Sequence, residues 1–268
     1  MPGPKKKLNP AAKYFAAAVL IIAVLLIIPI PARLLDILIS VNLLFALYIL
    51  VTALYAKKTG DIPLFPTIVL IFTVFCLAVN LSAARMALVK GADINGFLIR
   101  HAGSLMTGSG RINLYAGLGI FFVVYTGIIL FIAKGATRIA EVSARFALDS
   151  LPGKQMAIDV AFSTGSISMK EAETQKKDIL DELDFLASLD GTGKFLQGNV
   201  KAGIIITAGI IIGGTVMDCL LRGNSIAQAL ETYAFLAIGC GILSIVPVFL
   251  VSIAVGIMAS KAAGSKNP

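Results

Sequence analysis

The sequence predicts an all-α membrane protein, a polytopic helical bundle of about six transmembrane helices with one helical cytoplasmic loop. The chain has 268 residues, of which 57% are hydrophobic and 14% charged, whereas a soluble domain is about half apolar and a quarter charged. The apolar residues gather in runs that approach or exceed the ~20 residues needed to cross a bilayer. One long polar segment separates the fourth run from the fifth.

Six apolar runs are expected to span the membrane: Tyr14–Ile30, Leu34–Tyr55, Leu64–Leu88, Asn113–Ala133, Val200–Leu221 and Ala229–Ser260. The last contains Pro247, which predicts one helix kinked or broken near Ile245–Val248, with a hairpin or re-entrant pair as the alternative. Lysines precede the first run, but no small-residue cleavage site follows it. It therefore fits a retained helix better than a signal peptide.

Charge placement predicts the topology. The segment 134–199 is slightly acidic, whereas the rest of the chain is strongly basic and its lysines and arginines flank the apolar runs. Because positive loops stay in the cytoplasm, both termini are expected inside. The expected domains are a basic tail at 1–13, four spans at 14–133, a cytoplasmic loop at 134–199, two spans at 200–260 and a tail at 261–268. The connection 89–112, expected outside, carries three basic residues against this rule.

Several function classes are disfavoured. Flanking positive charge fits lipid headgroups better than nucleic acid. Cys76, Cys219 and Cys240 all lie in apolar runs, and the single histidine is His101, so neither a metal site nor a disulfide framework is expected. The stretch DGTGKF at 190–195 lacks the spacing of a phosphate loop. We therefore expect no enzyme and no cofactor.

The polar segment carries helix signals. Ile139, Val142 and Phe146 recur at helical spacing and predict a helix over Thr137–Leu148, ended by a Pro152-Gly153 turn. Charges at 138, 141 and 145 are spaced to pair on one face of that helix. Ser168 and Glu171 fit a capping box that opens a second helix, about Lys170–Leu189, with Ile179, Leu183 and Leu186 on its apolar face. Asp190-Gly191 is expected to end it. The plainest interpretation is a solvated helical hairpin.

The stretch 138–159, RIAEVSARFALDSLPGKQMAID, closely resembles the signature of the FHIPEP family, the FlhA/SctV-type export-gate membrane proteins of flagellar and type III secretion systems. LLD at 34–36, FPTIVLIFTVFCLAVN at 65–80, ELDFLASLDGTGKF at 182–195 and KAG at 201–203 also resemble the family, in its order. The resemblance covers about residues 20–260.

The resemblance implies a bacterial inner-membrane protein that forms a homo-oligomeric ring, works with other export-gate and basal-body proteins, and couples the proton motive force to protein secretion. It also implies that the loop is functional. The loop residues of interest are Arg138, Glu141, Arg145, Asp149, Lys154, Asp159, Asp190 and Lys194. Such a loop can change packing on protonation or ion binding, and Asp190 is the first candidate because it lies where the second helix meets the membrane-proximal turn.

The chain departs from the family pattern. Cys76 stands where the third span of the family has arginine, and Cys240 stands where a later span has an acid. The family also continues with two more spans and a large cytoplasmic domain, so a separately encoded domain is a possible partner. Asp36, Arg85, Asp218 and Glu231 remain at or near span ends, where long side chains can reach water. Asn42 and Asn80 suit interhelical hydrogen bonds.

Three hypotheses follow. The leading one is a membrane component of a flagellar or type III export gate. The second is a diverged, non-conducting homologue that scaffolds or regulates an envelope secretion complex, which the missing arginine and acid favour. The third, an independent secondary transporter, ranks last because no inverted repeat is evident.

Overall fold

The computed structural model describes residues 28–56, 61–108, 111–132, 135 and 137–264 of the chain. The first predicted span, Tyr14–Ile30, lies almost entirely outside these ranges. Within them the chain is helical and contains no strand. The predicted all-α class is therefore confirmed.

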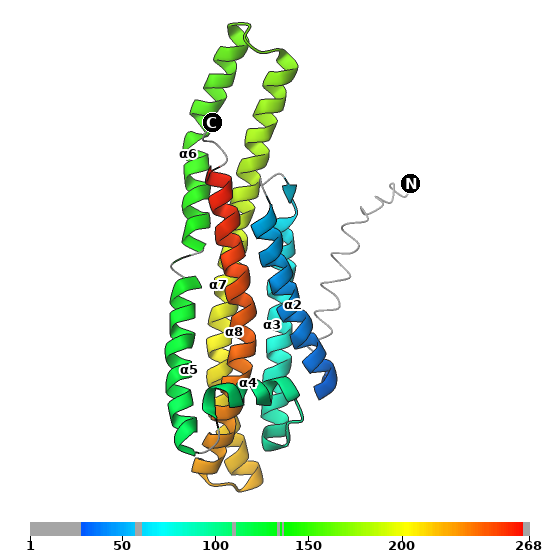
Figure 1. Ribbon diagram of the computed structural model, residues 1–268, viewed down its shortest axis with the longest axis vertical. Coiled ribbons are helices and arrows are strands. Elements are labelled where there is room, and N and C mark those ends of the chain that lie inside the picture. The colour runs from blue at the N-terminus through cyan, green and yellow to red at the C-terminus, as the bar shows by residue number, and fades with distance from the viewer. Residues whose placement is uncertain (1–27, 57–60, 109–110, 133–134, 136, 265–268) are drawn as a thin grey trace, which may run out of the picture. The chain divides into compact units, whose positions relative to one another are not determined.

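The helices follow one another along the chain with short connections (Figure 1). The fourth predicted span lies in α5. The polar segment is divided between α6 and the first part of α7, and the fifth predicted span forms the rest of α7. The elements are α2 (Ala32–Tyr55), α3 (Phe65–Lys90), the 3-10 helix η2 (Gly91–Asp93), α4 (Phe97–Thr107), α5 (Arg111–Phe131), α6 (Thr137–Ser163), α7 (Met169–Arg222) and α8 (Ile226–Gly264).

Five helices of the described residues are long and apolar enough to cross a membrane: α2, α3, α5, α7 and α8. Much of the apolar surface of α5 and α7 is not covered by protein, because only 17% of the apolar window of each is buried, against 61% for α8. Exposed side chains such as Phe122 and Val123 on α5, and Ile205 and Ile212 on α7, suit contact with lipid tails. A polytopic helical bundle is what the composition predicts.

The predicted end of the first loop helix at Pro152-Gly153 is wrong, because α6 continues through both residues to Ser163. Proline inside a helix removes one backbone hydrogen bond, to the carbonyl four residues earlier. That carbonyl belongs to Leu148, whose side chain is exposed, so water can replace the missing donor. One lost bond therefore does not end the helix.

The predicted stop at Asp190-Gly191 is also wrong, because α7 runs unbroken from Met169 to Arg222. Gly191 is not among the glycines with positive φ, so it does not form the left-handed cap that was expected. Nearby, Gly193 lies so close to Thr137 of α6 that a Cβ on it would come within 2.7 Å of the Thr137 methyl carbon. A glycine in this stretch therefore permits close helix packing and does not end the helix.

The last predicted span is a single helix, since α8 continues through Pro247 without a break. The hairpin or re-entrant pair offered as the alternative is therefore excluded. The break expected near Ile245–Val248 is absent for the same reason as at Pro152, because proline withdraws only one hydrogen bond from the helix.

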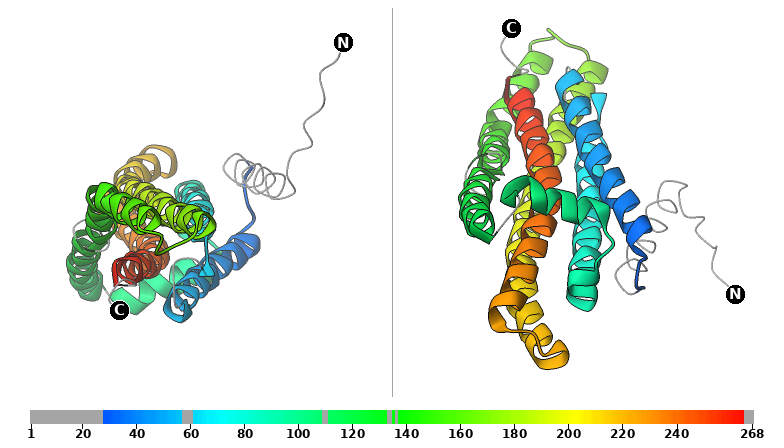
Figure 2. Two further views of the ribbon diagram at one scale, coloured as in Figure 1. Left: turned by 90° about the horizontal axis from the view of Figure 1, so that it is seen from above. Right: turned by 60° about the horizontal axis from the view of Figure 1, so that its bottom comes forward.

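The chain divides into two compact units, and several helices contribute residues to both. Unit 1 comprises 1–42, 74–118 and 203–244. Its core is built on α2, α3, α4, α7 and α8, with Leu35, Ile39, Ala87, Ile99 and Leu236 among its buried side chains. Figure 2 shows α4 crossing the first part of α8. The two helices approach closely there, because a Cβ on Gly239 would collide with the carbonyl oxygen of Ile99.

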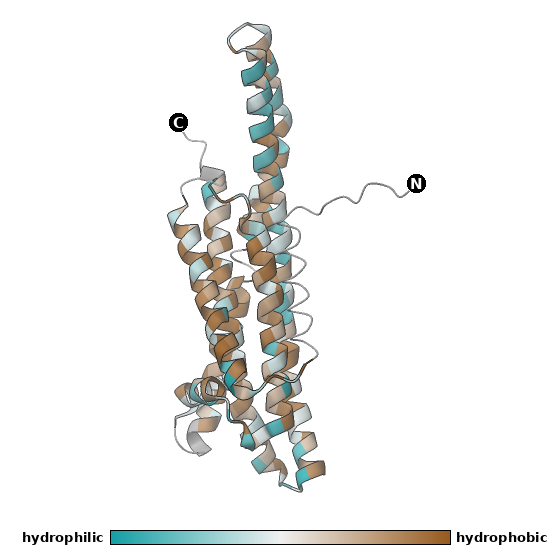
Figure 3. Ribbon diagram, turned by 90° about the vertical axis from the view of Figure 1, so that its right-hand side faces the viewer, coloured by the Kyte–Doolittle hydropathy of each residue, from teal (hydrophilic) through white to brown (hydrophobic). Residues whose placement is uncertain are grey.

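Unit 2 comprises 43–73, 119–202 and 245–268. Aromatic pairs join its helices: Phe45 packs edge-on against Phe72 at 5.7 Å, and Phe131 against Phe249 at 5.3 Å between ring centroids. Its polar part is the hairpin of α6 and the first half of α7, where hydrophilic residues are interspersed with hydrophobic ones in Figure 3. The predicted apolar positions of the second helix are confirmed, with Leu186 buried and Leu183 half-buried.

Candidate functional site

Asp36 on α2 caps α4. Its Oδ2 accepts a hydrogen bond of 3.0 Å from the Phe97 N–H, and its Oδ1 one of 3.1 Å from the Leu98 N–H. The N-cap residue of α4 is Gly96, which has no side chain to perform this task. A carboxylate at a helix N-terminus also opposes the positive end of the helix dipole. Asp36 is thus engaged structurally, and the helix it caps lies in the connection that the sequence analysis left without structure.

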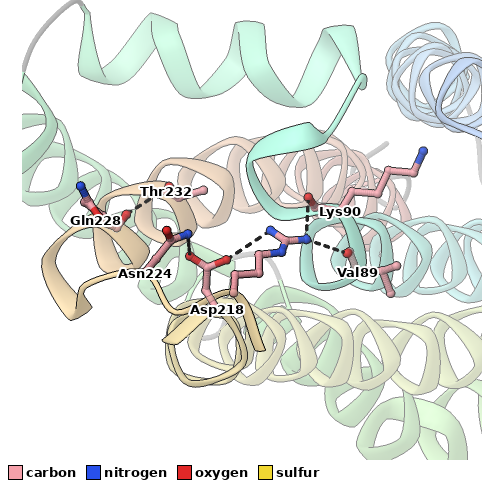
Figure 4. A network of polar contacts seen from close by, with 7 residues as sticks. Val89, Lys90, Asp218, Asn224, Gln228 and Thr232 are labelled. Atoms are coloured by element: carbon pink, nitrogen blue, oxygen red, sulfur yellow. Dashed lines mark hydrogen bonds and ion pairs between the residues drawn. The ribbon is translucent and has the colours of Figure 1, made fainter. Parts of the chain in front are cut away.

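Asp218 and Arg222 form the centre of a polar network at one end of unit 1 (Figure 4). Arg222 donates to Asp218 Oδ1 at 3.2 Å, and the Asn224 amide donates to Asp218 Oδ2 at 2.9 Å. The second guanidinium nitrogen of Arg222 donates to the carbonyls of Val89 and Lys90 at 3.2 and 3.1 Å. Asp218 is 4% exposed, so this pairing neutralises a charge that would otherwise be costly to bury.

The network therefore joins α7 to the carboxyl end of α3. The last carbonyls of a helix have no partner within it, and they carry partial negative charge. Arg222 satisfies two of them. Arg222 lies one residue beyond the predicted fifth span, Val200–Leu221, but its i,i+4 spacing from Asp218 indicates that the two residues can pair on one helix.

Asn42 and Asn80 make the interhelical hydrogen bonds predicted for them. Asn80 on α3 donates to the Ser244 hydroxyl of α8 at 2.7 Å. Asn42 on α2 donates to the Cys76 sulfur of α3 at 3.5 Å. These residues line one small cavity of about 10 Å³, and Cys240 lines it too. The family resemblance implies opposite charges at positions 76 and 240. The fold brings both positions to one cavity, which their separation in the sequence could not indicate.

Arg85 and Glu231 complete the charged residues predicted near the spans. Arg85 is exposed on α3, and Glu231 is half-buried near the start of α8. Glu231 and Arg100 both line a hollow of about 360 Å³ between α4 and α8. A transport role for either residue stays a prediction.

The capping box in the hairpin is confirmed. The Ser168 N–H donates to Glu171 Oε2 at 2.7 Å, and the Glu171 N–H donates to Ser168 Oγ at 3.3 Å. These two bonds lower the pKa of Glu171 below its ordinary value, the backbone donor contributing most. The preceding turn uses Gly165 at φ 73°, a left-handed conformation that glycine adopts without strain.

Two ion pairs order the charges of the hairpin. Asp159 on α6 contacts Lys176 on α7 at 2.6 Å, and Asp190 contacts Lys194 one turn later at 2.7 Å. The hydrogen bond that Lys194 donates to Asp190 raises the pKa of Lys194, and the negative charges of Asp190 and, less strongly, of Glu141 on α6 raise it further. Glu141 therefore acts across the hairpin. The pairs proposed for it with Arg138 and Arg145 do not form among the described side chains.

The other predicted loop residues lie at the surface. Arg138, Arg145 and Asp149 are exposed and Lys154 is half-buried. The predicted apolar positions on α6 also point outward, since Ile139, Val142 and Phe146 are all exposed, while Ala140 and Ala144 face the core. Helical spacing was correct for α6 but did not identify which face is buried. Functional roles for these loop residues stay predictions.

Lys261 was expected in a cytoplasmic tail, but it lies at the end of α8 and caps α2. Its Nζ donates to the carbonyls of Ala53, Leu54 and Ala56 at 2.9, 2.7 and 2.8 Å. No pattern in the sequence relates position 261 to position 56. In the described parts of the chain, no group of three or more His, Cys, Asp or Glu could hold a metal ion.

Comparison with known proteins points in one direction. The model of the FHIPEP family matches residues 21–268. The flagellar biosynthesis protein FlhA of Borreliella burgdorferi is 43% identical over 242 residues, which is 90% of this chain and 35% of that protein. FlhA of Caulobacter vibrioides is 40% identical over 251 residues, 92% of this chain and 35% of that protein.

A relative named for secretion also matches. The secretion system apparatus protein SsaV of Salmonella typhimurium is 35% identical over 256 residues, which is 94% of this chain and 36% of that protein. The chain thus spans about a third of the length of these relatives. No solved structure matches it.

Proposed function

The chain belongs to the FHIPEP family, and on that premise we propose that it is a membrane component of a flagellar or type III protein-export apparatus. The observation that carries the proposal is the family match across residues 21–268. The relatives bear names from both flagellar biosynthesis and secretion. Five helices suited to crossing a membrane support a membrane role.

The proposal includes a location and partners. The chain resides in the bacterial inner membrane with both termini in the cytoplasm, as the positive flanks of its spans favour. It assembles as a homo-oligomeric ring beside other export-gate membrane proteins and basal-body components. Nucleic acid is not among the proposed partners.

Co-purification from native membranes tests this proposal. Gentle detergent extraction and capture through a terminal tag is expected to bring down export-gate or basal-body proteins. A charge-reversed comparison, Asp159→Lys, replaces the 2.6 Å ion pair between Asp159 and Lys176 with two like charges and is expected to recover fewer of these partners. If the unaltered chain recovers no component of any export apparatus, the proposal is wrong.

We further propose that export by this apparatus is coupled to the proton motive force, with the α6–α7 hairpin as the element that responds. Its charges face one another across two helices and the surface is open to solvent. Substituting Asp190 with asparagine would break the ion pair with Lys194 while keeping the size of the side chain. Secretion that is less sensitive to an uncoupler in this variant is the expected result, and unchanged sensitivity would count against it.

A second candidate, a non-conducting homologue that scaffolds or regulates a secretion complex, is favoured by the cavity in unit 1. Cys76 and Cys240 both line it. Removing an arginine and an acid together avoids the cost of one unpaired buried charge, so loss of both is what a non-conducting descendant would show. The chain would then keep its assembly contacts and lack an ion path.

Restoring both charges distinguishes the two candidates. A Cys76→Arg, Cys240→Asp double variant in vesicles is expected to leak protons if the site once conducted, where the native chain does not. Each single variant is the control, since it carries an unpaired charge. A proton leak already present in the native protein would exclude the non-conducting candidate.

A further inference from the structure

The cavity in unit 1 has an unusual lining for its size. Its volume is about 10 Å³, and three helices, α2, α3 and α8, enclose it. Polar and sulfur-containing side chains make up much of the wall. The residues that matter here are Asn42, Cys76, Asn80, Cys240, Leu243 and Ser244.

One acceptor in this wall lacks a donor. Asn42 is 2% exposed, and its amide nitrogen is used in the bond to Cys76. Its Oδ1 is buried and has no hydrogen-bond partner among the described residues. Buried polar atoms without a partner are rare in folded proteins, and such an atom is commonly satisfied by ordered water.

A second candidate acceptor is the backbone carbonyl of Leu243, a residue that lines the same cavity. In an α-helix the carbonyl of Leu243 would accept from the N–H of residue 247. Residue 247 is proline, which has no N–H, and it lies within the unbroken helix α8. Proline is tolerated in membrane helices when ordered water or neighbouring groups satisfy the freed carbonyl. Leu243 lines the cavity.

We propose that this cavity is a binding site for one structural water, which donates one hydrogen to Asn42 Oδ1 and the other to the Leu243 carbonyl. A water needs roughly 10–15 Å³ of such space and two to four polar partners. The Cys240 thiol and the Ser244 hydroxyl lie in the same wall and can donate to the water oxygen. A monovalent cation fits the site less well, because no charged side chain lines it.

The water would tie three helices together where α8 has lost a backbone bond. Asn42 brings α2 to the water, and Leu243 brings α8. The Asn42 amide nitrogen donates a hydrogen bond to the Cys76 sulfur on α3. The Asn80–Ser244 hydrogen bond closes the adjoining contact between α3 and α8.

Filling the cavity tests the site. A Cys240→Leu substitution displaces the water and leaves two acceptors unsatisfied, so the melting temperature in detergent is expected to fall by roughly 5–10 °C. In a chain that already carries Asn42→Leu and Pro247→Ala, neither acceptor needs the water. The larger side chain crowds the small cavity in both backgrounds, so there the same Cys240→Leu change is expected to lower the melting temperature by several degrees less.

Cys219→Leu is the matched control, since Cys219 is only half-buried and does not line the cavity. An equal loss from Cys240→Leu in both backgrounds would overturn the proposal. The native protein gives a second measurement that needs no variant. A high-resolution density map should show one peak within hydrogen-bond distance of Asn42 Oδ1 and the Leu243 oxygen. An empty cavity, or a peak that thallium ions replace, would contradict the water site.

Discussion

Asp36 on α2 and Phe97 on α4 are joined by a 3.0 Å hydrogen bond from the Phe97 backbone N–H to the Asp36 carboxylate. The bond crosses 61 positions of sequence and fixes the start of a short helix that has no capping side chain of its own. Two other charged side chains also cap helices. Arg222 donates hydrogen bonds to the last carbonyls of α3, and Lys261 donates to those of α2. The charged side chains of Asp36, Arg222 and Lys261 thus each hydrogen-bond the end of a helix.

Replacing Asp36 with alanine should loosen α4. Two charge-assisted hydrogen bonds are lost, each contributing about 1.5–3 kcal/mol in favourable cases, and because Asp36 is only half-buried the combined cost should be near about 2 kcal/mol. Amide hydrogen exchange at the first turn of α4 should rise, and Asp36→Asn should retain part of the protection. Asp93→Asn is the control, because that carboxylate is exposed. Unchanged exchange in Asp36→Ala would contradict the capping role.

Replacing Arg222 with alanine should destabilise unit 1 strongly. It leaves the buried carboxylate of Asp218 with the Asn224 amide alone, and breaking a buried pair costs about 3–5 kcal/mol. The lower end is expected because Arg222 itself is 35% exposed on its side chain. Chemical unfolding in detergent measures the loss.

Two comparisons make the Arg222 result interpretable. Removing the charge of Asp218 as well, in an Asp218→Asn, Arg222→Ala double variant, should recover part of the stability. Lys90→Ala should change little, because the network uses only the backbone carbonyl of Lys90. A double variant no more stable than Arg222→Ala would show that the ion pair is not the cause.

Replacing Lys261 with methionine should free the end of α2. The change keeps an unbranched side chain and removes the ammonium that contacts three carbonyls. A loss of about 1.5–3 kcal/mol is expected, with faster amide exchange confined to the last turn of α2. Lys201→Met is the control, because Lys201 is exposed on α7. A loss of equal size in both variants would rule out a specific cap.

The capping box predicts a pH response at the start of α7. The pKa of Glu171 is held below its ordinary value of 4.5, so the folded state binds this proton less readily than the unfolded state. Its stabilisation is present above pH 4.5 and is lost as the pH falls through the lowered value. The hydrogen-exchange protection factors at residues 168–172, which correct for the intrinsic pH dependence of exchange, should therefore fall in acid.

The matched variant for this response is Glu171→Gln, whose side chain can still accept from the Ser168 N–H but does not titrate in this range. Its protection factors at residues 168–172 should be nearly independent of pH between about 3 and 6. An identical acid response in the native chain and in Glu171→Gln would exclude Glu171 as the titrating group.

The helices and the capping box could be predicted from sequence because each rests on local signals. Apolar runs mark the spans, and Ser168 and Glu171 mark a helix start by their spacing. Helix ends were harder to predict. Pro152 and Gly191 are strong local breakers, yet α6 and α7 continue through them, since packing and the surrounding helix-forming residues outweigh one lost bond.

The tertiary partners of charged residues could not be predicted. Asp36 and Phe97, or Lys261 and Ala53, are far apart in sequence, and no periodicity relates them. The cavity lined by Cys76 and Cys240 could not be predicted either. The family resemblance implies charges that are missing at these two positions, and only the fold brings the two positions together. Helical spacing also did not indicate which face of α6 is buried, since Ile139 and Phe146 point outward.

Labelling of engineered cysteines by a membrane-impermeant maleimide, in intact cells and in inverted vesicles, shows on which side of the membrane the α6–α7 hairpin lies. Lys154→Cys reports on the α6–α7 hairpin, and Ser104→Cys, on the exposed face of α4, reports on the opposite side. Lys154→Cys is expected to react only in inverted vesicles, and Ser104→Cys only in intact cells. Labelling of Lys154→Cys from outside intact cells would place the hairpin beyond the cytoplasm and contradict the proposed export role.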